Sequence, residues 1–279
     1  MAIASVIVSD SAVHGLSMAF WRSWIAAPVI GIYALWEQNQ RLTLKKFLLC
    51  APAGLCFGLS IGLFFWSTQV TTLVNASLIS SLQPIIIVAL SYYFFHERIT
   101  SVDVAFAAVA IGGAVVIVLA GSSDGTGKLS GDLLALIAII LGSFYFAFGK
   151  HTLKQLSVAE FMAGYFVWAG IVLTPMVLIV GAGIMPKTSR DIIQILAVAF
   201  IPGVGHVLIN YSQGKAPLNM IGVLQLLIPV TATALAFLFL NATVSYFKAI
   251  GMIVVIVTIG ASTYTRSKRE EREKNISIE

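Results

Sequence analysis

The sequence predicts an all-α polytopic membrane protein, and three observations lead to this fold class. Of the 279 residues, 58% are hydrophobic and only 10% are charged, against about 25% charged in ordinary soluble domains. The apolar residues gather in stretches close to the ~20 residues that a helix needs to cross a bilayer. Only short polar segments separate these stretches, so no room remains for a soluble catalytic domain and no enzymatic activity is expected.

Nine apolar stretches are predicted to be membrane-spanning helices. They cover residues 16–36, 47–67, 71–94, 102–121, 131–149, 159–182, 191–211, 216–240 and 245–264. A stack of helical repeats in water would need polar faces, which these stretches lack.

The distribution of lysine and arginine predicts the orientation, because cytoplasmic loops carry an excess of both. The tail at 265–279 is strongly basic and is therefore expected in the cytoplasm. Counting back through the spans gives the same side to Arg41, Lys45, Lys46, Arg98, Lys150, Lys154 and Lys215. The opposite side receives only Lys128, Lys187, Arg190 and Lys248. The pI of 9.2 thus reflects topology, and nucleic acid is not an expected partner.

An internal repeat becomes visible when the chain is shifted by 145 residues, which places Pro84 on Pro229 and Gly58 on Gly203. Five spans fit into this offset, so the second copy is expected upside down relative to the first. Such inverted repeats are typical of carriers with a site at the membrane midplane. We expect a first repeat at 1–121, a linker at 122–130, a second repeat at 131–264 and the charged tail. The first repeat is expected to lack most of its opening helix, which leaves nine spans of an expected ten; the alternatives are a truncated start and a genuine nine-helix protein.

The two equivalent prolines lie near the midplane of their spans. A helical proline removes the hydrogen bond to the carbonyl four residues earlier, here that of Ser80 and that of Gln225. Gln83 falls on the same helix face as Ser80. We expect Pro84 and Pro229 to kink their helices and the three polar residues to bind substrate in a central cavity. The alternative is that each proline only bends its helix to fit the neighbours.

Two polar residues, His206 and Asn210, share one face of the span at 191–211. An ionisable residue inside a membrane is a functional candidate by default. Both are predicted to bind substrate, and His206 could also carry a coupling proton. The alternative is a neutral histidine bonded to a backbone carbonyl.

One arginine, Arg22, lies inside a span between Trp21 and Trp24. It could bind a substrate carboxylate, or it could extend to the outer interface beside the two tryptophans. Trp66 and Tyr211 occupy equivalent positions near span ends. They are candidate gates, with interfacial anchoring as the alternative.

Two further motifs have mainly structural interpretations. Gly54, Gly58 and Gly62 recur every four residues and predict a close-packed helix face, either within the chain or in a homodimer. After the proline-bearing span, Thr100 and Asp103 are spaced to cap the next helix. The preceding Glu97 is expected to keep the turn in cytoplasmic water, with a role in gating as the alternative.

The segment "NASLISSLQPIIIVALSYYFFHERITSVDVAFAAVAIGGAVVIV" resembles the end of an EamA-type repeat of the drug/metabolite transporter superfamily. "FWRSWIAAPVI" similarly resembles the arginine-aromatic second helix of that family. The second copy departs from the pattern, because Asn241-Ala-Thr243 stands where His96-Glu97-Arg98 stood. The resemblance implies a carrier for small metabolites, often an exporter of amino acids.

Other functions remain open at this point. A sugar-phosphate or nucleotide-sugar exchanger would need several basic residues at cavity depth, where the sequence offers only Arg22. A non-transporting membrane subunit would fit a missing first helix. The expected partners are a small-molecule substrate, lipid and protons, and no cofactor or metal site is expected.

Overall fold

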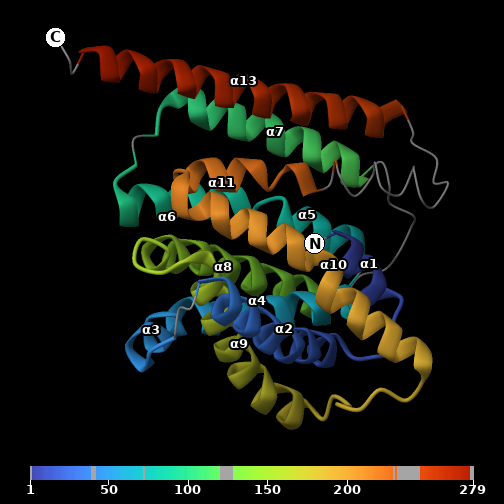
Figure 1. Cartoon of the computed structure of the whole chain (residues 1–279). Helices are drawn as coiled ribbons and strands as arrows, with labels where there is room; N and C mark the ends of the chain where they lie inside the picture. The colour runs from blue at the N-terminus through green and yellow to red at the C-terminus, as the bar shows by residue number, and fades with distance from the viewer. Residues whose placement is uncertain are drawn as a thin grey trace.

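The computed structural model describes residues 2–38, 42–71, 73–97, 99–119, 128–228, 230 and 246–276, and these residues contain helices and no strand. The helices are α1 (Ala2–Ser9), α2 (Gly15–Gln38), α3 (Leu44–Leu49), α4 (Ala51–Val70), α5 (Leu73–Ser80), α6 (Gln83–Phe95), α7 (Ser101–Leu119), α8 (Leu129–Thr152), α9 (Val158–Val180), α10 (Ser189–Lys215), α11 (Leu218–Leu224) and α13 (Tyr246–Ile276) (Figure 1).

Five of these helices are long and apolar enough to cross a membrane: Gly15–Trp36, Ala51–Val70, Leu129–Thr152, Val158–Val180 and Ser189–Lys215. They coincide with five of the nine predicted spans. Three shorter apolar stretches, Gln83–Phe95, Ser101–Gly113 and Ala249–Ser262, overlap three others. The chain is therefore an all-α polytopic membrane protein in its described part, and the number of nine spans stays a prediction.

The span predicted at 71–94 is divided rather than kinked. Ser81 and Leu82 form a turn between α5 and α6, and Pro84 stands in the first turn of α6. A proline is well tolerated there, because the backbone N–H of the first turn has no partner inside the helix. The second repeat has a similar turn at Gln225 and Leu226 after α11.

The glycine face of α4 packs against α9 of the same chain. A Cβ atom added to Gly58 would lie 2.7 Å from the Cα of Ala169, and one added to Gly54 would lie 2.7 Å from the carbonyl oxygen of Tyr165. Only glycine permits such a close approach of two helices. This confirms the predicted close-packed face and assigns it to the interior of the chain, where a second copy cannot reach it.

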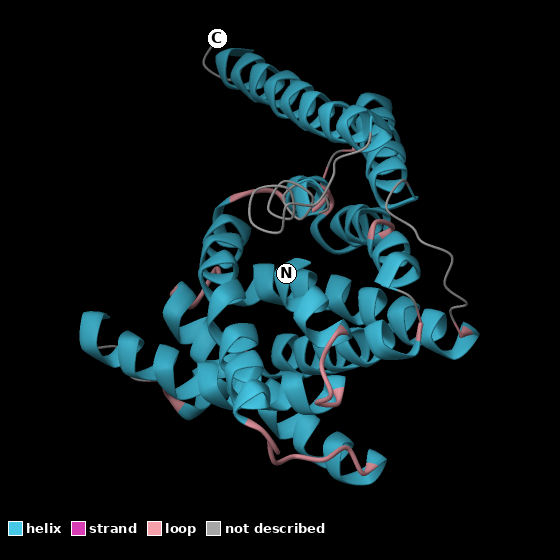
Figure 2. Ribbon diagram, turned by 90° about the vertical axis from the view of Figure 1, so that its right-hand side faces the viewer, coloured by secondary structure: helices cyan, strands magenta, loops and turns pink. Residues whose placement is uncertain are grey.

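Most buried apolar side chains form one large core, contributed mainly by α1, α2, α4, α8, α9 and α10, with Ile87 of α6 and two residues of α11, Leu218 and Ile221. A second, smaller cluster joins Ala110 of α7 and Val255 of α13 to Leu226 after α11. The α7 and α13 helices lie side by side at one edge of the bundle, with α5, α6 and α11 between them and the large core (Figures 1 and 2).

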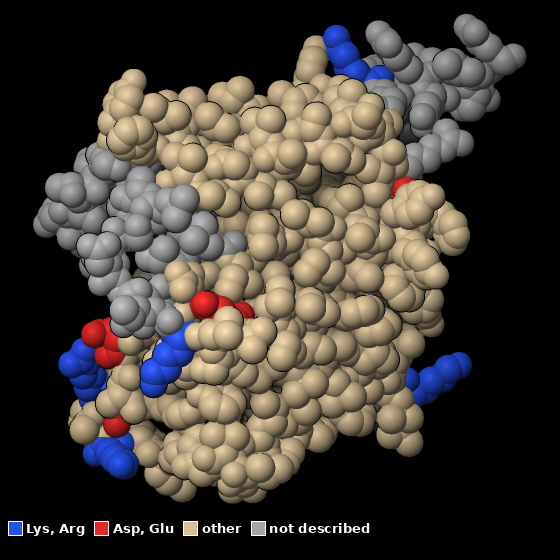
Figure 3. Space-filling view, turned by 180° about the vertical axis from the view of Figure 1, so that it is seen from behind, with Lys and Arg blue, Asp and Glu red and all other residues tan. Residues whose placement is uncertain are grey.

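Charged contacts lie at the ends of the helices. Lys46 Nζ lies 2.5 Å from Glu160 Oε1, and Arg190 contacts Asp10 at 3.0 Å. Glu160 also completes a capping box at the start of α9 with Ser157. In the view of Figure 3, most of the surface shows neither acidic nor basic side chains, as expected for a face in contact with lipid.

The connection from α1 to α2 is organised by the side chain of Gln69 in α4. Its amide nitrogen donates to the carbonyl oxygens of Val8 at 3.1 Å and Val13 at 2.8 Å. Its oxygen accepts from the backbone N–H of Gly15 at 2.7 Å. One side chain therefore satisfies backbone groups at both ends of the connection.

Candidate functional site

A cluster of polar and aromatic side chains lies inside the large core, and Arg22 of α2 is its only permanently charged member. The side chain is 1% exposed, and its guanidinium carbon lies 5.8 Å from the centre of the Phe57 ring in α4. None of its three guanidinium nitrogens has a hydrogen-bond partner among the described residues. Arg22 therefore points into the bundle and does not reach the outer surface.

Aromatic rings from three other helices surround Phe57. Its ring centre lies 5.0 Å from that of Tyr145 in α8 and 4.9 Å from that of Tyr165 in α9. The ring of His206 in α10 lies edge-on at 5.4 Å. Edge-to-face pairs of this kind are favourable, so the rings form a well-defined wall beside the arginine.

Hydrogen-bonding groups complete the cluster. The Tyr145 hydroxyl donates to Asn210 Oδ1 at 2.7 Å, and Asn210 is fully buried. His206 is 3% exposed, and neither of its ring nitrogens has a partner in the described part of the chain. We call Arg22, Phe57, Tyr145, Tyr165, His206 and Asn210 the Arg22 cluster.

The cluster lacks a counter-charge in the described structure. The described ion pairs are Lys46–Glu160, Lys150–Glu97 and Arg190–Asp10, and none includes Arg22. A buried charge without a partner is costly, while a guanidinium offers five donors in a planar fork that suits a carboxylate. The arrangement can therefore bind a small anion that bears a carboxylate.

Three predicted site residues lie elsewhere, beside the helix breaks. The Ser80 hydroxyl donates to the carbonyl of Ala76 at 2.8 Å. Gln83 packs against Gly142, where an added Cβ would lie 2.8 Å from the Gln83 amide nitrogen. The side-chain nitrogen of Gln225 is buried without a partner among the described residues.

The helices beside the two breaks are neighbours in space. Gly222 of α11 packs against Ile87 and Pro84 of α6, so the two predicted polar stripes belong to adjoining helices. Pro229 lies outside the described residues, and its predicted kink stays a prediction.

The two candidate gates lie at the ends of different helices. Trp66, near the end of α4, packs against His14, with ring centres 5.5 Å apart. Burial lowers the pKa of this histidine. Tyr211 is 52% exposed near the end of α10 and stacks with Lys215.

Sequence reasoning found Arg22, His206 and Asn210 but missed the residues between them. Phe57, Tyr145 and Tyr165 bring the three predicted residues into one cluster. The sequence carried no signal for these three residues, because their depth in the bundle becomes known only once the helices are packed.

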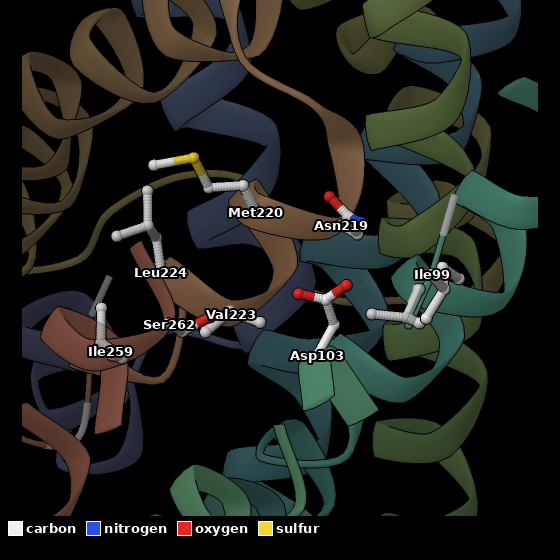
Figure 4. Close-up of a pocket in the computed structure, with 9 residues that line it drawn as sticks. Ile99, Asp103, Asn219, Met220, Val223, Leu224, Ile259 and Ser262 are labelled. Carbon is white, nitrogen blue, oxygen red and sulfur yellow. The ribbon is translucent and has the colours of Figure 1, made fainter. Parts of the chain in front are cut away.

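A small pocket lies apart from the cluster, where α6 and α7 meet α11 and α13 (Figure 4). Its polar lining includes Asp103, Asn219 and Ser262. Asp103 also accepts hydrogen bonds from the backbone N–H and the hydroxyl of Thr100, which confirms the predicted cap of α7.

The sequence profile of the EamA-like transporter family matches residues 1–119 and 129–264. The chain belongs to this family. It is therefore a membrane protein of a transporter family.

One curated relative is named "Probable terminal-alkyne amino-acid exporter", from Streptantibioticus cattleyicolor. It is 29% identical over 169 residues, which are 60% of this chain and 56% of the relative. The alignment thus spans little more than half of the relative's length. A solved structure described only as "Crystal structure of protein" has the same fold, with a TM-score of 0.76, 19% identity, and coverage of 94% of this chain and 95% of the other.

Proposed function

We propose that this EamA-family protein is a secondary transporter that exports a small carboxylate-bearing metabolite, such as an amino acid, by alternating access. The observation that carries the proposal is the buried Arg22 guanidinium, which has no acceptor among the described residues. A substrate carboxylate would supply the missing counter-charge. The name of the curated relative supports amino acids as the class.

The remaining side chains of the Arg22 cluster have complementary roles. The rings of Phe57, Tyr145 and Tyr165 would contact the apolar part of the substrate. Asn210, held by the Tyr145 hydroxyl, would bind a polar group beside the carboxylate. Closing these groups around the substrate excludes water, which strengthens each electrostatic contact.

The test is uptake of labelled amino acids into proteoliposomes under an imposed pH gradient. Arg22→Gln should reduce transport by about 10- to 100-fold, because it removes a charge-assisted, bidentate contact worth ~1.5–3 kcal/mol. The matched control is Arg190→Gln, which removes an arginine that is 72% exposed and should leave transport unchanged. Equal transport by wild type and Arg22→Gln would contradict the proposal.

The same assay also tests two alternative functions. A sugar-phosphate or nucleotide-sugar exchanger would need more than one cation to balance a phosphate, and Arg22 is the only lysine or arginine in the cluster. Transport of sugar phosphates with no amino-acid transport would nevertheless favour it. No transport of either class would favour a non-transporting membrane subunit.

We further propose protons as the coupling ion and His206 as the residue that carries them. The ring nitrogens of His206, which have no partner in the described structure, lie in the same cluster as Arg22. Protonation and substrate binding would therefore influence each other through charge. His206→Gln should abolish accumulation driven by a pH gradient and leave substrate exchange at equal pH. Unchanged gradient-driven accumulation would exclude this role.

The proposed location is the cell membrane, with several crossings and a cytoplasmic C-terminus. The support for this orientation is the distribution of lysine and arginine, with the strongly basic tail on the cytoplasmic side. Protease digestion of a C-terminal tag in sealed inside-out vesicles tests it. A tag that is protected there would reverse the orientation.

A further inference from the structure

Three helix ends meet at the side chain of Glu97, which follows the last residue of α6 by two positions. Glu97 Oε1 lies 2.5 Å from Lys150 Nζ near the end of α8. The same oxygen accepts from the backbone N–H of Leu218 at 2.7 Å, and Oε2 accepts from that of Asn219 at 3.1 Å. We call these interactions the Glu97 contact.

The backbone before Glu97 is in an uncommon conformation. His96 has a φ of +50° and is the only non-glycine residue with positive φ in the described part of the chain. Its N–H and that of Glu97 both reach the carbonyl oxygen of Ser91. This left-handed residue ends α6 and turns the chain, so that Glu97 points toward α8 and α11.

The contact is well shielded from water. The side chains of Lys150 and Glu97 are 14% and 11% exposed. Lys150 Nζ also lies 5.0 Å from the centre of the Phe95 ring, at the end of the same α6 helix. The carboxylate thus has a charged partner and two backbone donors in a partly dry place, where such bonds are strongest.

The Glu97 contact ties the first half of the chain to the second. Glu97 belongs to the first predicted repeat, whereas Lys150 and Leu218 belong to the second. Further along the same interface, Gly222 of α11 packs against Ile87 of α6. If the two halves rock against each other, these helix ends must separate whenever the central site opens at this end.

We propose that the Glu97 contact is the gate that closes the cytoplasmic end of the transport pathway. The inference rests on the proposed transport function and on the predicted orientation. Substrate enters from the cytoplasm only when Glu97 releases both Lys150 and the first backbone N–H groups of α11. Glu97 is thereby a gating residue and does not touch the substrate.

A second ion pair at the same end provides a matched control. Lys46 and Glu160 also lie 2.5 Å apart, and Glu160 also accepts from a backbone N–H, that of Ser157. This pair joins α3 to α9, and α9 is packed tightly against α4 by glycine. This pair also joins the first half to the second, but the α4–α9 packing holds the two helices together without it, so breaking it should not open the α6–α11 interface.

The test measures access to the α6–α11 interface with the substitution Ile87→Cys, because Ile87 is fully buried and contacts Gly222. Cys50 and Cys56 are first replaced by alanine, and a membrane-impermeant maleimide is added from the cytoplasmic side. Glu97→Ala and Lys150→Ala should each raise the labelling rate by about tenfold, the shift expected when a charge-assisted hydrogen bond is lost from one state. Lys46→Ala should leave the rate unchanged.

Glu97→Gln covers the case in which Glu97→Ala does not fold. The glutamine oxygen can still accept from a backbone N–H, while the ion pair with Lys150 is lost, so labelling should rise by a smaller factor. The exchanged pair Glu97→Lys with Lys150→Glu should restore slow labelling in part. If the Glu97→Gln and Lys150→Ala variants fold and are labelled as slowly as the wild type, the proposal that the Glu97 contact is a gate is wrong.

The outcome separates the gate from the transport proposal, because labelling needs no substrate. Faster labelling at position 87 in a protein that transports none of the tested metabolites would keep the gate and contradict the proposed function. If the protein transports amino acids but the Glu97 substitutions leave labelling unchanged, the transport proposal is kept and the gate is contradicted.

Discussion

Two helix pairs of this molecule pack through glycine, but they differ in how closely the partner backbone approaches the glycine. In the α4–α9 pair, a Cβ on Gly58 would lie 2.6 Å from Val172 Cγ1 and only 2.7 Å from the Cα of Ala169. In the α7–α13 pair, a Cβ on Gly113 would meet the side chain of Val255 at 2.9 Å and the carbonyl of Gly251 at 3.1 Å. The first pair lies in the large core beside the Arg22 cluster, and the second lies at the edge of the bundle.

This difference indicates where the structure is rigid and where it can give way. Phe57 and Tyr165 sit beside the glycine contacts of α4 and α9, so backbone-to-backbone packing fixes the rings that surround Arg22. The α7–α13 pair carries no member of the cluster. We therefore expect the same substitution to have a much larger effect in the first pair than in the second.

The largest effect should come from Gly58→Leu. The added side chain cannot fit between α4 and α9 without moving their backbones, which is expected to lower the free energy of unfolding by about 3 kcal/mol or more. Thermal unfolding in detergent, followed by circular dichroism, measures the loss. A stability close to that of the wild type would show that the two helices are less constrained than their contacts indicate.

A smaller effect of opposite sign is expected from Arg22→Met. The buried guanidinium has no acceptor in the described part of the chain, so an apolar side chain of similar length should raise the stability by ~2 kcal/mol while transport is lost. The same unfolding experiment, combined with the uptake assay, detects both changes. A variant that is less stable than the wild type would mean that Arg22 has a partner inside the protein.

Gly113→Leu should cost about 1–2 kcal/mol, because the valine side chains of α13 can move aside in part. Gly112→Leu on the neighbouring position is the control, since nothing lies within 4 Å of its added Cβ. A cost for Gly113→Leu as large as that for Gly58→Leu would remove the distinction between the two pairs.

The smallest effect is expected from Lys46→Ala. The lysine is 37% exposed, and its partner Glu160 keeps the bonds of the capping box, so the loss should be ~1 kcal/mol or less. Chemical unfolding at low and high salt measures it, and high salt should reduce the difference. A salt-independent loss of several kcal/mol would indicate that the pair is part of the core.

The sequence predicted the long helices well and the divided helix poorly. Apolar length is a local property, so helices such as α8 and α9 could be placed from composition alone. Whether Pro84 bends a helix or stands after a break depends on its neighbours. Here the turn at Ser81 and Leu82 precedes a helix that packs against α8 and α11, and no local pattern describes that packing.

The sequence pointed to individual residues of the site but did not show that they lie together in one cluster. Arg22 and His206 are unusual inside apolar spans and were therefore recognisable one at a time. Their proximity depends on how α2, α4 and α10 pack, which the sequence alone does not give. The tyrosines were missed for a different reason, because tyrosine is common at membrane interfaces and the side chains of Tyr145 and Tyr165 are unremarkable until their depth is known.

The contacts of the Gln69 side chain determine the order in which two parts of this protein can fold during synthesis. Gly15, which opens α2, bonds to Gln69 across a separation of 54 residues. At about 5–20 residues per second, the ribosome needs roughly 3–11 s to make that intervening chain. Until then the backbone groups of the α1–α2 connection have no amide to bind. The beginning of α2 therefore acquires its final form only after the helix that organises it has been made.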